Sequence, residues 1–260
     1  MISIDPPVVL FLLAIILFGL CLLILHKVRR IHLMQYALQQ QLEKNLPEHL
    51  HHTYQQIQAF IDLNRLLQLT YPLPPLRGWA ASPDFLLLLA EHIFQKKPRF
   101  IVECSSGAST VVLAQCAKLN GYGQVLSLEH DAHYAEKTRQ QLIKQGLEDW
   151  ATVIDAPLIN YEFNGQNYQW YKLNAQIENT CIDMLVVDGP PASLNHCARY
   201  PAGPLLLPLL NKEGVVFLDD ADRPDEKEII ERWMEKFTGF LVYLYPCEKG
   251  AVVFLSSENI

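Results

Sequence analysis

The chain has 260 residues, half of them hydrophobic, and a formal net charge of −7 at neutral pH. This length suits one sizeable α/β domain with an additional segment. The acidic balance excludes a general nucleic-acid-binding protein, because a surface that follows phosphates needs clustered lysine and arginine. We therefore expect no nucleic-acid partner.

The first predicted element is a transmembrane helix over residues 8–25. This stretch, VVLFLLAIILFGLCLLIL, has no charge, and at about 1.5 Å per residue it spans about 27 Å, close to the hydrocarbon thickness of a bilayer. A buried globular helix would have a polar face, and a signal peptide would have its positive charge before the apolar run. Here Asp5 precedes the run, while Lys27, Arg29 and Arg30 follow it. The pattern predicts an uncleaved anchor that binds the membrane.

The same charges predict the topology. Lysine and arginine near the end of a span stay on the cytoplasmic side, so we expect a single-pass inner (cytoplasmic) membrane protein. Residues 1–7 form a short extracytoplasmic N-terminus, and the main domain is cytoplasmic. The six cysteines include no C-x-x-C pair, a pattern typical of reduced thiols rather than of a disulfide framework.

Residues 26–75 are predicted to form a helical stalk and linker. Apolar residues recur three and four apart in IHLMQYALQQQLEKNL and YQQIQAFIDLNRLLQL, as in amphipathic helices. Pro47 interrupts the pattern, which favours a stalk over a sustained coiled coil. We expect this stalk to be the contact if the chain forms a homo-oligomer. The proline-rich stretch YPLPPLRG, residues 71–78, marks the boundary.

The remaining residues, 76–260, are predicted to form an α/β domain. Short apolar runs at RFIVEC, QVLSLEH, ATVID, CIDMLVVD and GVVFLDD alternate with helical stretches. Repeated strand–helix–strand units predict a mostly parallel sheet covered on both faces. YEFNGQNYQWY, residues 161–171, centres on Asn-Gly, a strong hairpin signal. FLVYLY and AVVFLS flank CEKG and predict an antiparallel hairpin that closes the sheet.

The stretch IVECSSGAST, residues 101–110, connects the first predicted strand to a helix. It has one glycine where nucleotide-binding loops usually have three. Ser105, Gly107 and Ser109 are nevertheless all small, which allows a ligand to approach the main chain. On its own, this loop does not distinguish a cofactor site from a buried strand that leads into a helix.

Acidic residues end the first three predicted strands. Glu103 ends the first and Asp155 ends the third, followed by Ala156. Glu129 ends the second, about 20 residues after the loop, where an acidic side chain binds a ribose diol. Acids are common in loops, but three in this order favour a ligand crevice at the carboxyl ends of the strands.

A second acidic group follows the next two predicted strands. LVVDGPP contains Asp188, and VVFLDD ends in Asp219 and Asp220. Adjacent parallel strands would bring these carboxylates to one rim, where three oxygen ligands suit Mg²⁺, Mn²⁺ or Ca²⁺. Two structural alternatives stay open. Asp188 can simply shape a turn, and the later acids can complement the dipole of the following helix.

Over residues 76–260 the order of elements and the motifs E-x-S-S-G-A-S-T, S-L-E-H-D, V-I-D-A and L-V-V-D-G-P-P resemble a class I S-adenosylmethionine-dependent methyltransferase, in a bacterial membrane-anchored subgroup. The resemblance implies a Rossmann-like, seven-stranded, mostly parallel sheet that ends in an antiparallel hairpin. It implies S-adenosylmethionine as cofactor, with serine at the outer two glycine positions of the loop. The implied cofactor-binding residues are Glu103, Ser105, Gly107, Ser109, Glu129 and His130 at the second strand, and Asp155 and Ala156 on the adenine side.

The second acidic group is similar to that of metal-dependent O-methyltransferases of the catechol and caffeoyl-coenzyme A type. This similarity implies that Asp188, Asp219 and Asp220 hold Mg²⁺ or another divalent cation, with Asp188 also catalytic. Catechol-type enzymes have a lysine base three residues after the first aspartate, whereas this chain has Pro191. His196, on the same loop, is therefore the candidate base.

We therefore expect methyl transfer to an oxygen of an acceptor at the cytoplasmic membrane face, with a small-molecule, lipid-linked or polysaccharide acceptor. Two alternatives stay open. Asp220-Ala221-Asp222 is a D-x-D pattern, as in metal-dependent glycosyltransferases that bind nucleotide sugars, although this leaves Glu129 and its loop unexplained. The chain can also be a cofactor-binding scaffold without catalysis.

Overall fold

The computed structural model describes residues 6–256, and the chain divides between Tyr54 and Gln55 into two compact units. Helix α1 (Pro6–Leu67) runs through Pro47 without interruption. The predicted anchor and stalk are therefore one continuous helix. Its most apolar 18-residue window has a mean hydropathy of 3.4 and no buried residue, so length and composition allow it to cross a membrane. Of the predicted N-terminal segment, residues 1–5 lie outside the described range.

The second unit begins within the last turns of α1. Gln56, Ala59, Leu63 and Leu67 are buried at spacings of three and four, so one stripe of the helix packs on the domain. Leu63 and Leu67 belong to its hydrophobic core. The compact unit therefore includes residues that the sequence assigns to the stalk.

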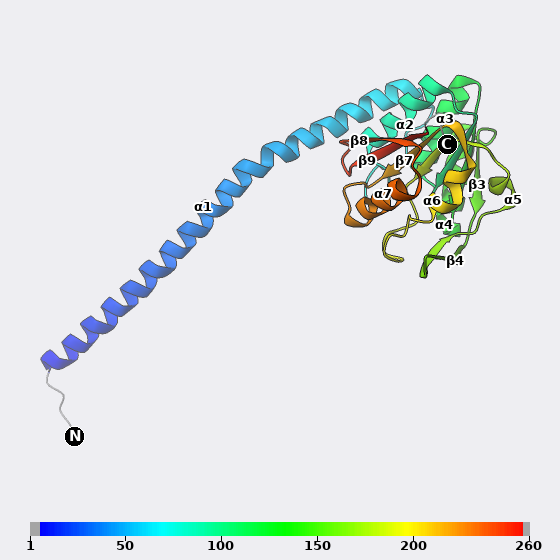
Figure 1. Ribbon diagram of the computed structural model, residues 1–260. Helices are drawn as coiled ribbons and strands as arrows, with labels where there is room; N and C mark the ends of the chain where they lie inside the picture. Colours follow the sequence, from blue (N-terminus) through cyan, green and yellow to red (C-terminus); the bar gives the residue numbers. More distant parts are fainter. Residues whose placement is uncertain (1–5, 257–260) are drawn as a thin grey trace. The chain divides into compact units, whose positions relative to one another are not determined.

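A seven-stranded sheet forms the centre of the second unit (Figure 1), in the order β3-β2-β1-β6-β7-β9-β8. All neighbours are parallel except that β9 is antiparallel to both β7 and β8. The strands are β1 (Phe100–Cys104), β2 (Gln124–Glu129), β3 (Ala151–Asp155), β6 (Ile182–Val187), β7 (Leu210–Asp219), β8 (Phe240–Tyr245) and β9 (Ala251–Ser256). This confirms the predicted mostly parallel sheet with a closing hairpin.

Helices cover both faces of the sheet. One face packs against α2 (Pro83–Lys96), α3 (Ala108–Asn120) and α4 (Ala132–Gln145). The other face packs against α5 (Ala175–Glu178), α6 (Ala202–Leu206), the 3₁₀ turn η1 (Leu207–Leu209) and α7 (Pro224–Lys236). Neighbouring strand residues therefore enter different cores, such as Ile101 in the first and Val102 in the second. This is why the strand sequences are almost continuously apolar.

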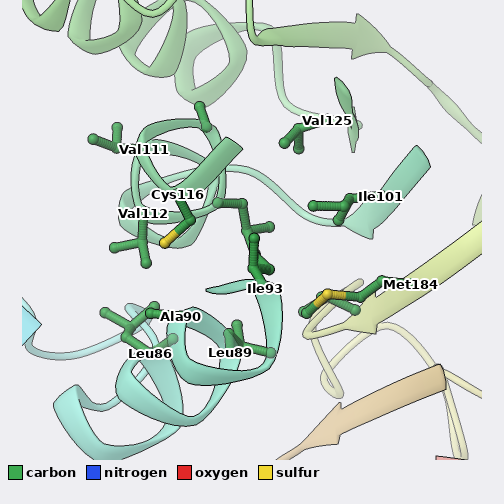
Figure 2. Packing of buried hydrophobic residues seen from close by; sticks show 14 of the residues in the cluster. Leu86, Leu89, Ala90, Ile93, Ile101, Val111, Val112, Cys116, Val125 and Met184 are labelled. Carbon is green, nitrogen blue, oxygen red and sulfur yellow. The ribbon is translucent and has the colours of Figure 1, made fainter. Parts of the chain in front are cut away.

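Figure 2 shows the first core from close by. Leu86, Leu89 and Ile93 of α2 lie near Val112 and Cys116 of α3. The strand side chains Ile101, Val125 and Met184 lie to the right of these helices in the view. α2 begins with Ser82 at the N-cap position and Pro83 in the first turn, where proline is favoured. Burial of each large aliphatic side chain contributes about 1.5–3 kcal/mol, so this packing holds the sheet and its loops in place.

The hairpin predicted around Asn-Gly is confirmed: β4 (Leu158–Phe163) and β5 (Gln166–Tyr171) form a separate antiparallel pair. Its two turn residues, Asn164 and Gly165, have φ angles of 52° and 75°, as a type I′ turn requires. β5 contributes buried aromatic side chains to the second core, and Tyr171 also lines the cavity described next.

Candidate active site

A cavity of about 640 Å³ lies at the carboxyl ends of the central strands. Its wall includes Ser105 after β1, Glu129 at the end of β2, Asp188 after β6 and Asp220 after β7. The strand order reverses between β1 and β6, and open α/β sheets bind ligands at such a switch point. The volume suits a cofactor together with part of an acceptor.

The loop after β1 forms one wall of this cavity. Ser105, Gly107 and Ser109 all line it, so the structure brings the predicted loop residues together. Gly107 has a φ of 156°, which other residues adopt only with strain. A Cβ there would meet no atom within 4 Å, so the requirement for glycine is a backbone one. Ser105 accepts a φ of 122° despite its side chain, which places strain at the first loop position.

Glu129 faces the cavity and ties the loop to β2. Its Oε2 accepts hydrogen bonds from Ser106 N at 3.0 Å and Ser106 Oγ at 2.9 Å, and its Oε1 accepts from the backbone N–H groups of His130 and Asp131. The His130 ring nitrogen Nδ1 lies 3.1 Å from Oε1. Burial raises the pKa of Glu129, but the hydrogen bonds from His130, Asp131 and Ser106 outweigh it and lower the pKa overall. Glu129 is therefore a fixed carboxylate at the position predicted for ribose recognition.

Glu103 is fully buried and does not line the cavity. Thr110 Oγ1 donates a hydrogen bond to its Oε2 at 2.7 Å and accepts one from Gly107 N. Burial raises the pKa of Glu103 to about 7, and its Oε1 has no partner. This predicted cofactor residue therefore supports the loop from beneath through Thr110.

Asp155 and Ala156 end β3 away from the cavity wall. The Asp155 side chain is 66 % exposed and pairs with Arg139 at 2.7 Å. Ala156 is buried, and its N–H donates to the Glu129 carbonyl at 2.7 Å. Neither residue lines the cavity, so a role beside the adenine stays a prediction.

The second acidic group converges as the strand order predicts. One carboxylate oxygen of each of Asp188, Asp219 and Asp220 lies within 4.8 Å of the others. Asp188 and Asp220 line the cavity, whereas Asp219 lies fully buried behind it. Burial, with repulsion from the neighbouring carboxylates, raises the pKa of Asp188 and of Asp219.

Arg199, on the loop after β6, joins this group. Its Nη2 donates to Asp220 Oδ2 at 2.7 Å, to the Asp188 carbonyl at 2.9 Å and to Asp188 Oδ1 at 3.3 Å. Its Nη1 donates to the Asp219 carbonyl at 2.9 Å and lies 3.6 Å from Glu226 Oε1. Arg199 is 3 % exposed. It therefore links the ends of β6 and β7 through both their backbones and their carboxylates.

Three oxygens of this carboxylate group are available as ligands for a divalent cation. Both oxygens of Asp219, and Oδ1 of Asp220, are buried without a hydrogen-bond partner. Buried polar atoms normally have partners, and an oxygen-binding cation such as Mg²⁺ would supply them. The donors present therefore fit the predicted ion, with Arg199 holding the opposite side of the group.

His196 lies elsewhere. It is absent from the wall of the main cavity and lines a smaller hollow with Tyr168 and Asn195. Its Nε2 lies 3.2 Å from Glu228 and 3.7 Å from Asp225, both on α7. The structure thus separates the predicted base from the acidic group that it was expected to serve.

Two further segments form the cavity mouth. α4 contributes Tyr134 and Lys137, and the segment before α2 contributes Arg77 and Trp79. Trp79 is 75 % exposed, although core packing would be the usual role of a tryptophan. None of these residues belongs to a motif, and the fold brings both segments to the same cavity.

Comparisons with known proteins agree with this geometry. Residues 102–221 match a family model described as a methyltransferase domain. No curated protein sequence matches the chain.

Several solved structures share the fold. An O-methyltransferase of tomaymycin synthesis from Streptomyces achromogenes, in complex with S-adenosylmethionine, aligns with a TM-score of 0.51 at 17 % identity, covering 78 % of this chain and 89 % of that one. An O-methyltransferase from Bacillus cereus, in complex with S-adenosylhomocysteine, aligns with a TM-score of 0.52 at 17 % identity, covering 78 % of this chain and 91 % of that one. A methyltransferase from Podospora anserina, also bound to S-adenosylhomocysteine, aligns with a TM-score of 0.53 at 14 % identity, covering 76 % of this chain and 88 % of that one. At these identities the likeness is one of fold. The second unit therefore has the fold of these methyltransferases, and residues 102–221 within it match the methyltransferase-domain model.

Proposed function

We propose that this protein transfers the methyl group of S-adenosylmethionine to an oxygen of an acceptor at the cytoplasmic face of a membrane. One observation carries the proposal: a single cavity joins the loop and Glu129 on one wall to Asp188, Arg199 and Asp220 on the other. O-methyltransferases among the structural neighbours support transfer to oxygen. The acceptor classes are a small molecule, a lipid-linked molecule or a polysaccharide.

On the cofactor side, bound S-adenosylmethionine supplies a methyl group on a positively charged sulfonium. Glu129 is placed to accept hydrogen bonds from the ribose hydroxyls, with His130 beside it. The small side chains between Ser105 and Ser109 leave the main chain accessible. These residues would hold the cofactor in the same cavity as the acidic wall.

On the acceptor side, the Asp188 carboxylate is placed to take the proton of an acceptor hydroxyl. The bound cofactor would supply the methyl group as its methyl–sulfur bond breaks, while Asp188 would take the proton of the hydroxyl and release it to solvent. Asp188, Asp219 and Asp220 would hold a divalent cation, which supplies Lewis-acid stabilisation of the acceptor oxygen. His196 has no part in this scheme, since it does not line the cavity.

The predicted anchor explains the location. α1 is apolar enough to cross a membrane, and the positive charges after residue 25 favour a single-pass topology with the N-terminus outside and the catalytic domain in the cytoplasm. An anchored domain meets membrane-associated acceptors at high local concentration. We propose the same helix as the contact between copies of the chain in a homo-oligomer.

The test of the function is calorimetry on the full chain in detergent. We expect S-adenosylmethionine to bind with micromolar affinity or better, and a nucleotide sugar not to bind. The reverse preference would support the glycosyltransferase alternative, and no binding of either would support a scaffold. Asp222 of the D-x-D pattern does not line the cavity, which favours the methyltransferase.

The metal is tested separately, with Mn²⁺ as the probe because it prefers oxygen ligands. We expect one Mn²⁺ per chain by calorimetry, and Asp219→Asn to abolish its binding, since Asp219 has two carboxylate oxygens without partners. Asp222→Asn is the matched control and should bind Mn²⁺ normally. If Asp222→Asn loses Mn²⁺ and Asp219→Asn keeps it, the ion belongs to the D-x-D pattern instead.

A further inference from the structure

A second group of metal-ligating side chains lies where the loop after β6 meets α7. His196, Cys197 and Glu228 each place one ligand atom within 4.8 Å of the others. His196 and Cys197 belong to the loop, whereas Glu228 and the adjacent Asp225 belong to the first turns of α7. None of the four lines the main cavity, so the proposed methyl transfer leaves the group without a role.

The spacing of these atoms is close to that of a tetrahedral metal site. The His196 Nε2 atom lies 3.8 Å from Cys197 Sγ, 3.2 Å from Glu228 Oε2 and 3.7 Å from Asp225 Oδ1. With bonds of about 2.3 Å to sulfur and about 2.0 Å to nitrogen and oxygen, tetrahedral zinc would place sulfur and nitrogen about 3.5 Å apart, and nitrogen and oxygen about 3.3 Å apart. The distances from His196 Nε2 to the sulfur and to Glu228 Oε2 are thus within about 0.3 Å of those expected for tetrahedral zinc.

The backbone at Cys197 also holds the loop close to α7. Cys197 has a φ of 51°, a left-handed conformation that a non-glycine residue adopts at a cost. Its N–H donates to Asp225 Oδ2 at 2.9 Å, which fixes the loop against α7. The Cys197 side chain is buried, while His196 is largely exposed. An ion would therefore reach the sulfur from the solvent side, past the imidazole.

We infer that His196, Cys197 and Glu228 form a zinc site, with Asp225 beside it and the fourth position left to water, that fastens the loop after β6 to α7. Mixed sulfur, nitrogen and oxygen donors suit zinc, whereas Mg²⁺ and Mn²⁺ prefer oxygen alone. This site is independent of the proposed function and of the Asp188 group. By holding the loop that also carries Arg199, it would steady the acidic wall of the cavity.

The charge balance is consistent with this ligand set. Without an ion, the Cys197 thiol donates its proton to the Asp225 carbonyl, 3.7 Å from Sγ. Zinc binding replaces that proton, which leaves to solvent. A thiolate and two carboxylates carry three negative charges. Zn²⁺ and the guanidinium of Arg232, 3.8 Å from Glu228 Oε1, carry three positive ones.

The test uses Co²⁺ as a spectroscopic substitute for zinc on the full chain in detergent. We expect one equivalent of Co²⁺ to produce a thiolate-to-cobalt charge-transfer band in the near ultraviolet, and added Zn²⁺ to remove it. Cobalt bound by the Asp188 group has only oxygen ligands and gives no such band. Cys197→Ser should abolish the band, and Cys181→Ser, which changes an exposed cysteine elsewhere, should keep it.

His196→Gln keeps the test decisive if Cys197→Ser does not fold, because His196 is 62 % exposed. We expect it to weaken Co²⁺ binding at least about 10-fold, the loss that follows even when a partner of a metal ligand is removed. Circular dichroism verifies that each variant is folded. The inference is overturned if the wild-type chain shows no charge-transfer band, if Cys197→Ser keeps the band, or if His196→Gln binds Co²⁺ unchanged.

Discussion

Replacing Arg199 by methionine is expected to lower the free energy of unfolding of the second unit by about 3–5 kcal/mol, the usual cost of leaving buried charges without their partner. The guanidinium is almost fully buried and contacts the carboxylates of Asp188, Asp220 and Glu226. Methionine fills a similar volume but donates no hydrogen bond. The side chains of Asp220 and Glu226 are even less exposed than that of Arg199, so water cannot replace the lost donors.

Denaturant unfolding followed by tryptophan fluorescence measures this effect, because Trp170 and Trp233 are fully buried in the same unit. Arg223→Met is the matched control. Arg223 contacts the same Asp220 Oδ2, at 2.9 Å, but is 40 % exposed, and ion pairs of partly exposed side chains contribute about 1 kcal/mol or less. Equal losses in the two variants would contradict the role assigned to Arg199.

The distribution of charge around Arg199 has a consequence for the site. Arg199 donates to Asp220 Oδ2, whereas both oxygens of Asp219 and Oδ1 of Asp220 accept no hydrogen bond, with Lys249 Nζ 3.9 Å from Asp220 Oδ1. The arginine therefore holds the carboxylates together without occupying every ligand position. A divalent cation and the guanidinium can then be present at once, each with its own oxygens.

The sequence predicted the sheet well because its signals are local. Near-continuous apolar runs of strand length identify the parallel strands, and Asn164-Gly165 identifies its own hairpin. Positions at strand ends follow from the same reasoning, which is why Glu129, Asp188, Asp219 and Asp220 were predicted at one edge. The carboxyl ends of parallel strands lie at the same edge of the sheet, and this does not depend on which side chains they carry.

What the sequence could not predict depends on side-chain direction and on contacts between distant segments. Arg199 meets its partners only after the loop folds back over β6 and β7. His196 follows Asp188 closely in sequence, yet it turns to α7, and Asp155 pairs with Arg139 instead of facing the cavity. Pro47 lies inside α1, which continues to Leu67, so the interrupted pattern did not show where the helix ends.

Replacing Glu129 by alanine is expected to weaken S-adenosylmethionine binding at least about 100-fold. A hydrogen bond to a charged group contributes about 1.5–3 kcal/mol, and the proposed ribose contact uses two hydroxyls. Glu129 also orders the loop through Ser106 N and Ser106 Oγ. The variant therefore loses both a ligand contact and part of the support of the loop.

Two controls separate these causes. Ser106→Ala removes only the hydroxyl donor and keeps the carboxylate, so its affinity should stay within a few-fold of the wild type. Glu162→Ala removes an exposed acid of β4 and tests the change in net charge alone. If Ser106→Ala weakens binding as much as Glu129→Ala, loop order and not ribose recognition is the main contribution of Glu129.

Ligand-induced stabilisation gives a second readout, because a ligand stabilises only the state that binds it. At a concentration of 100 Kd, S-adenosylmethionine should stabilise the wild-type domain by about 2.7 kcal/mol. A variant with 100-fold weaker affinity would gain about 0.4 kcal/mol at the same concentration. Full stabilisation of Glu129→Ala would remove Glu129 from the cofactor site. It would not affect the fold or the Asp188 group. It would remove only the proposed link between the small-residue loop and the cofactor, which is the fixed carboxylate at the end of β2.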